Sequence, residues 1–189
     1  MQFMLHQLVY IILLKMDFSK GLNIQLATLF GIGKLPGGGT WSSLIILLIA
    51  LAERSAETAS FIAFFSLTIA PRAYKKLVKE LNIEDPKEFV LDEIIGMGMS
   101  LGLVNIFIYF FISNTDEFST MEIFNRNNLF IITFIIFRFF DISKVGPVGW
   151  IENNENETPY MRVIGDDIAA ALLSALIVII FLSINLWVL

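Results

Sequence analysis

Apolar stretches of different lengths alternate with short polar segments along the chain. Two of them, 94–112 and 169–189, are close to the roughly 20 residues that a membrane-spanning helix needs. Three others, 41–52, 58–70 and 129–140, are shorter. This pattern predicts an all-α fold, a polytopic membrane helical bundle whose helices differ in length.

The stretches 41–52 and 58–70 are joined by the charged turn 53–57. They predict either a re-entrant helical hairpin or two short, deformed spans, so that the chain returns to the side it left. The glycine-rich segment 27–43 before them is expected to be a loop, because Gly and Pro destabilise helices. Segment 71–91 is charged, with apolar positions at helical spacing, and predicts an amphipathic segment.

Composition supports a membrane protein. The chain is 56% hydrophobic and 16% charged, with a mean hydropathy of +0.74, whereas an ordinary soluble domain is about 25% charged. We expect one membrane domain over residues 1–189, with residues 3–14 as a helix that lies at the membrane interface or against the bundle. The absence of Cys excludes thiolate ligands and a cysteine nucleophile, and the net charge of −5 argues against nucleic acid as a partner.

The distribution of basic residues predicts the orientation. If the N-terminus is cytoplasmic, all Lys and Arg except Arg54 and Arg126 fall in cytoplasmic segments. The glycine-rich segment and the start of 94–112 then lie on the cytoplasmic face. We therefore expect a multi-pass protein whose active site faces the cytoplasm.

Two pairs of adjacent acids precede the long apolar stretches, Asp92-Glu93 and Asp166-Asp167. One acid at a helix start is explained by capping and by the helix dipole. Two pairs in a chain with few charges favour a metal site, because Mg²⁺ prefers carboxylate oxygens and keeps waters free for a phosphate. Capping or structural pairing remains the alternative.

A third group of charges, Arg138, Asp141 and Lys144, has a spacing of three, which places them on one face of a helix. By themselves they would form salt bridges, with Lys144 extending toward the interface. Beside the other acids, Asp141 becomes a candidate fifth metal ligand. Arg138 is then a candidate phosphate clamp, because its planar guanidinium matches phosphate oxygens, and Lys144 adds positive charge.

The glycine-rich segment is a weaker candidate site. Its backbone N–H groups around Gly39 and Thr40 could bind an anion, but the segment lacks the Gly-Lys-Ser/Thr ending of a P-loop. A flexible connector is at least as consistent with its composition.

Four blocks in this order resemble the phosphatidylglycerophosphatase A family of bacterial membrane lipid phosphatases. They are residues 30–43, DPKEFVLDEIIG (85–96), IFRFFDISKVGPVGW (136–150) and GDDIAAA (165–171). The first block departs from the family pattern: it lacks a second proline and has Ser42 in place of a glycine.

The resemblance implies Mg²⁺-dependent hydrolysis of phosphatidylglycerophosphate to phosphatidylglycerol and phosphate in the bacterial inner membrane. It is consistent with catalytic and metal-binding roles for Asp92, Glu93, Asp141, Asp166 and Asp167. Phosphate contacts are expected from Arg138, Lys144, Gly39 and Thr40. We expect direct attack by water, with a phospho-aspartyl intermediate as the alternative.

Two other classes of protein also use acidic residues at or in a membrane. A CDP-alcohol phosphotransferase-like enzyme also uses carboxylates and a divalent metal at the membrane surface, but it needs a longer array of spaced aspartates. A non-enzymatic transporter would place its carboxylates near the middle of the bilayer, whereas these acids are expected at helix ends.

Overall fold

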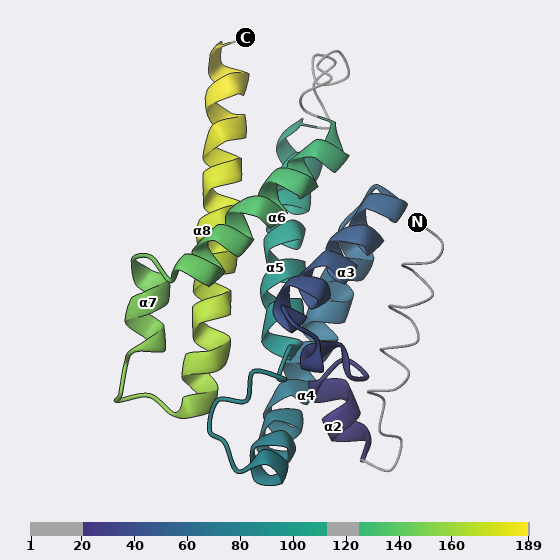
Figure 1. Ribbon diagram of the computed structural model, residues 1–189. Coiled ribbons are helices and arrows are strands. Elements are labelled where there is room, and N and C mark those ends of the chain that lie inside the picture. The colour runs from purple at the N-terminus through teal and green to yellow at the C-terminus, as the bar shows by residue number, and fades with distance from the viewer. Residues whose placement is uncertain (1–20, 113–124, 189) are drawn as a thin grey trace.

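The computed structural model describes residues 21–112 and 125–188, which form a bundle of helices (Figure 1). The long helices are α3 (Gly38–Glu53), α4 (Glu57–Leu81), α5 (Leu91–Phe107), α6 (Arg126–Ser143) and α8 (Pro159–Val188). The short ones are α2 (Leu22–Ala27), the 3-10 turn η1 (Ile32–Lys34), the π-helical turn η2 (Ile108–Ile112) and α7 (Pro147–Glu152). The described residues contain no strand, which confirms the all-α prediction; the helix expected at 3–14 lies outside them.

Helix α5 is the centre of the bundle and contacts α3, α4, α6 and α8. Its approach to α4 depends on small side chains. A methyl group added at Gly98 would lie 2.6 Å from the carbonyl oxygen of Ala59, and one at Gly102 would overlap Ser60. Small residues of this kind let helix backbones approach closely where apolar surroundings provide little hydrophobic drive.

Helices α5 and α8 are joined by a buried polar contact. The hydroxyl oxygens of Ser100 and Ser174 lie 2.6 Å apart, and both residues are fully buried. The two helices also approach closely at Gly96, where an added methyl would lie 3.0 Å from the carbonyl oxygen of Asp167. These contacts hold the start of α5 against α8 at the level of the acidic pairs.

Helix α4 corrects the expectation of a short arm at 58–70. The helix continues through Pro71 to Leu81, for 25 residues, so the arm and the following amphipathic segment form one element. A proline inside a helix removes one backbone hydrogen bond and costs about 3 kcal/mol. Burial of Ala70, Ala73, Tyr74 and Leu77 along the inner face of the helix offsets this cost.

The exposed face of α4 changes character along the helix. Its first half exposes Phe61, Phe64 and Phe65. Its second half exposes Arg72, Lys75, Lys76 and Lys79. The basic half is level with the starts of α5 and α8, because the Tyr74 ring packs against Phe89 and Tyr160 at centroid distances of 5.4 and 5.3 Å. An apolar face that becomes basic is typical of a helix leaving a bilayer.

Among the described residues, two helices are long and apolar enough to cross a membrane, Leu91–Phe110 and Pro159–Ile184. The first agrees with the stretch 94–112. The second corrects the expected start of the last helix, because α8 begins at Pro159 and places Asp166 and Asp167 about two turns inside it. The loop expected over 27–43 is also shorter, since Gly38 and Gly39 belong to the first turn of α3.

Candidate active site

The five acids that the sequence singled out lie around one cavity of about 350 Å³. They come from three helices: Asp92 and Glu93 from the first turn of α5, Asp141 from the last turn of α6, and Asp166 and Asp167 from α8. Helices α5 and α8 run in the same direction and α6 runs opposite to them, so the start of α5 meets the end of α6 beside α8 (Figure 1).

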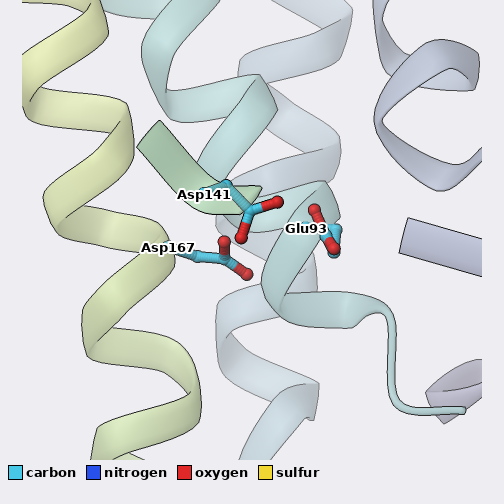
Figure 2. A group of neighbouring side chains, drawn as sticks. All are labelled: Glu93, Asp141 and Asp167. Carbon is cyan, nitrogen blue, oxygen red and sulfur yellow. The ribbon is translucent and has the colours of Figure 1, made fainter. Parts of the chain in front are cut away.

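Glu93, Asp141 and Asp167 form the tightest part of this group. One carboxylate oxygen of each lies within 4.8 Å of the other two, and the three side chains point toward a common centre (Figure 2). The Oδ1 atom of Asp167 is buried and has no hydrogen-bond partner among the described residues. Anionic oxygens at this separation repel one another, so a cation between them would relieve the repulsion. The residues present therefore fit a hard cation such as Mg²⁺.

The position of Asp167 separates metal binding from capping. Since Asp166 and Asp167 are two turns inside α8, the backbone amides around them are already paired within the helix, and no free amide needs a cap. In both acidic pairs the first aspartate accepts a hydrogen bond from the next amide. The distances are 2.9 Å from Glu93 N to Asp92 Oδ1 and 2.9 Å from Asp167 N to Asp166 Oδ1.

Lys144 ends α6 in a left-handed conformation, with φ of 50°, and its ammonium group reaches back to the acids. The Nζ atom donates to Asp166 Oδ2 at 2.6 Å and to Asp141 Oδ1 at 3.1 Å. Burial lowers the pKa of Lys144. The hydrogen bond to Asp166 and the charges of Asp166, Asp141 and Asp167 outweigh burial and raise this pKa above its ordinary value. Lys144 is therefore a fixed positive charge in the cavity wall.

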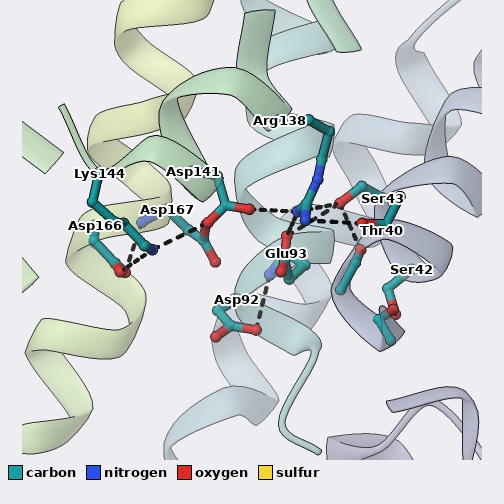
Figure 3. Close-up of polar contacts among 12 residues, drawn as sticks. Thr40, Ser42, Ser43, Asp92, Glu93, Arg138, Asp141, Lys144, Asp166 and Asp167 are labelled. Carbon is teal, nitrogen blue, oxygen red and sulfur yellow. Dashed lines mark hydrogen bonds and ion pairs between the residues drawn. The ribbon is translucent and has the colours of Figure 1, made fainter. Parts of the chain in front are cut away.

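Arg138 lies on the other side of the acids (Figure 3). Its guanidinium pairs with Glu93 and, at 2.5 Å, with Asp141, and its Nη2 atom donates to Thr40 Oγ1 at 3.0 Å. The Ser43 hydroxyl donates to Glu93 Oε2 at 3.2 Å. Arg138 and Thr40 are not among the described residues that line the cavity. The ion pairs of Arg138 orient two carboxylates, Thr40 holds the guanidinium, and the binding of phosphate by Arg138 and Thr40 stays a prediction.

Gly39 has a spatial role in this arrangement. A methyl group at this position would overlap the Glu93 carboxylate, so the carboxylate could keep its position only beside a glycine. This contact links the glycine-rich segment to the acidic group. An additional role of the Gly39 backbone in binding phosphate also stays a prediction.

The sequence reasoning missed Ser43, which contacts Glu93, and several charged residues that line the cavity: Lys87, Arg162, Asp85 and Glu152. Arg162 had a detectable signal. It is four residues before Asp166 and shares its helix face once the helix is extended to Pro159. No comparable local pattern connects Ser43 or Lys87 with the acids.

Comparison with known proteins identifies the family. The profile of phosphatidylglycerophosphatase A matches residues 25–182, which include all five acids and every basic residue discussed above. The chain belongs to the phosphatidylglycerophosphatase A family. No curated protein and no solved structure matches the chain.

Membership of the phosphatidylglycerophosphatase A family implies phosphatase activity on phosphatidylglycerophosphate, a membrane lipid, in phospholipid biosynthesis. It confirms the resemblance found in the sequence and supports a phosphoric monoester hydrolase. Together with the two apolar helices, it indicates a membrane protein.

Proposed function

We propose that this chain is a Mg²⁺-dependent phosphatase that hydrolyses the terminal phosphate of phosphatidylglycerophosphate at the cytoplasmic surface of the bacterial inner membrane. The products are phosphatidylglycerol and inorganic phosphate. The observation that carries the proposal is the convergence of Glu93, Asp141 and Asp167 from three helices in a chain of the phosphatidylglycerophosphatase A family.

Glu93, Asp141 and Asp167 would hold the metal, and Asp92 and Asp166 complete the anionic wall around it. When bound, Mg²⁺ supplies polarisation of a phosphoryl oxygen and lowers the pKa of a water molecule. The salt bridges of Arg138 keep Glu93 and Asp141 in place, and the hydrogen bond from Ser43 restricts Glu93 further. Ligands held in this way do not need to reorganise when the substrate arrives.

The residues of the cavity also fit the chemical step. Lys144 would neutralise charge on the phosphoryl oxygens. A carboxylate of the cavity would accept a proton from the attacking water as the bond between water oxygen and phosphorus forms. The bond from phosphorus to the glycerol oxygen breaks, and this oxygen receives the proton that the carboxylate took from the water, which returns the carboxylate to its charged form. Direct attack needs no covalent phospho-enzyme.

Helix α4 supports a position of the site near the membrane surface. Its exposed face changes from apolar to basic between Phe65 and Arg72, beside the starts of α5 and α8. The cavity would therefore lie near the headgroup level, where the phosphate of a lipid is found. At the other end of the bundle, Arg126 donates to the carbonyl oxygen of Arg54 at 3.3 Å. Arg54 and Arg126 are the two basic residues that the proposed orientation places outside the cytoplasmic segments. They lie together at one end of the bundle, as this orientation requires.

Phosphate release from phosphatidylglycerophosphate by the purified protein in detergent, with Mg²⁺ and with a chelator, tests this proposal. We expect release that depends on Mg²⁺. Supplying a CDP-activated lipid with an alcohol acceptor tests the phosphotransferase alternative, from which we expect no product. Absence of phosphate release in the presence of Mg²⁺ would reject the phosphatase and favour a non-enzymatic membrane protein.

A further inference from the structure

Two basic residues that line the cavity, Lys87 and Arg162, have no acidic partner among the described residues. This distinguishes them from the other basic side chains of the site. Lys144 is paired with Asp141 and Asp166, and Arg138 is paired on the far side of the acids. The cavity therefore has a second region in which positive charge is not neutralised by ion pairs.

Arg162 lies toward the start of α8, four residues before Asp166, which corresponds to a rise of about 6 Å along the helix. It is partly buried, and its Nε atom is buried without a hydrogen-bond acceptor among the described residues. A buried donor without an acceptor is costly, and a ligand that supplies an acceptor removes this cost.

Lys87 reaches the same cavity from the segment between α4 and α5, and it is exposed. Asp85 and Glu152 also line the cavity, and neither forms an ion pair with Lys87 or Arg162. An anion that enters the cavity and contacts Lys87 and Arg162 would therefore not have to displace an existing ion pair.

The substrate of the proposed reaction carries two phosphates. The terminal one is a monoester, and the other is the phosphodiester that joins the glycerol to the lipid. The glycerol between them is comparable in length to the rise of about 6 Å that separates Arg162 from Asp166. We propose that Arg162 and Lys87 bind the phosphodiester of the lipid while the carboxylate group acts on the terminal phosphate. This inference rests on the proposed function and assigns a second anion site within the same cavity.

The second site would determine selectivity. Phosphatidic acid has a terminal phosphate and no phosphodiester, so it would leave the Arg162 donors unpaired. A site built to hydrogen-bond a group discriminates strongly against a ligand that lacks it. Phosphatidylglycerol, the product, retains the phosphodiester and should bind the second site without any reaction.

The first test compares two lipids and two variants, Arg162→Gln and Lys87→Gln. For phosphatidylglycerophosphate we expect a rise in KM of about tenfold or more in Arg162→Gln and a smaller rise in Lys87→Gln, with kcat little changed. For phosphatidic acid we expect kcat/KM within about twofold of the wild type. Arg162→Lys should restore part of the lost affinity. Matched controls are Arg72→Gln and Lys79→Gln, which remove exposed charges from α4 outside the cavity.

The second test measures binding and does not depend on catalysis. Short-chain phosphatidylglycerol is titrated into the metal-free protein in detergent by calorimetry. We expect binding to the wild type and to Arg72→Gln, and about tenfold weaker binding to Arg162→Gln. Equal binding by all variants would overturn the proposal, as would a parallel loss of activity on both lipids. If the wild type released no phosphate from either lipid, the proposed function would fail, and the binding result would still decide whether the second anion site exists.

Discussion

The carboxylate of Glu93 occupies the space that a side chain at Gly39 would need. Gly39 is in the first turn of α3 and Glu93 in the first turn of α5, so this contact joins the glycine-rich segment to the acidic group. The glycine allows the close approach of the Glu93 side chain in its observed position. Its conformational freedom is not the reason, since it has no positive φ.

Gly39→Ala should therefore reduce activity without unfolding the protein. The methyl group would displace the Glu93 carboxylate from Asp141 and Asp167, and we expect a loss in kcat/KM of about tenfold or more. Alanine favours a helix over glycine by up to about 1 kcal/mol, which limits any loss of stability. Phosphate release and thermal unfolding measure the two effects. Gly21→Ala is the control, because nothing lies within 4 Å of its added methyl. Normal activity of Gly39→Ala would contradict the spatial role.

Asp167→Asn tests metal binding with almost no change in shape. Because Asp167 is inside α8 and caps no helix, we expect the fold to be retained. Loss of one anionic ligand should lower kcat/KM by at least about 100-fold, equivalent to ~2.7 kcal/mol of transition-state stabilisation. It should also abolish the increase in melting temperature that Mg²⁺ produces in the wild type. Glu155→Gln removes an exposed charge from the loop before α8 and serves as control. An active Asn variant with unchanged Mg²⁺ dependence would exclude the metal role.

Arg138→Lys separates phosphate binding from salt-bridge formation. Lysine preserves the charge but loses the planar guanidinium, which in the structure contacts Glu93, Asp141 and Thr40 at once. We expect Arg138→Lys to fold and to retain Mg²⁺ binding, while it hydrolyses the lipid phosphate poorly. Kinetics and Mg²⁺-dependent melting of Arg138→Lys and Arg138→Ala provide the comparison. Turnover near the wild-type value in the lysine variant, with loss of the fold in the alanine variant, would make Arg138 purely structural.

The membrane orientation can be tested with single cysteines, because the chain has no Cys. In inside-out vesicles we expect a membrane-impermeant maleimide to label Lys76→Cys on the basic half of α4. Phe64→Cys on its apolar half should stay unlabelled, since lipid would cover it. Arg54→Cys should react in right-side-out vesicles instead. Labelling of Lys76→Cys from the outside would reverse the proposed orientation.

Much of the architecture was predictable from local pattern. The length and apolar character of 94–112 predict a helix that can span a membrane. In the structure, α5 and η2 cover this stretch. The acidic pairs, together with Arg138, Asp141 and Lys144, marked the candidate site because charges are costly beside long apolar segments. This reasoning needs only neighbours in sequence and the dimensions of a helix, so no tertiary contact had to be known.

The extent of two helices was decided by packing. The sequence pattern ended the apolar arm at residue 70 and began a separate amphipathic segment at 71, but burial of one face carries α4 through Pro71. The first turns of α8, before Asp166, were not predicted because they are polar. Apolar periodicity locates the buried segment of a helix and not its first residue.

Only the tertiary structure decided which side chains of the site contact one another. Arg138 lies between Glu93 and Asp141, and Glu93 lies over Gly39, although these residues are on three different helices. Arg162 and Lys87 reach one cavity from segments far apart in the chain. The sequence by itself determined which residues carry charge and which segments are helical. Which charges meet depends on the close approach of helix backbones at glycine and alanine, and that approach is a property of the packed bundle.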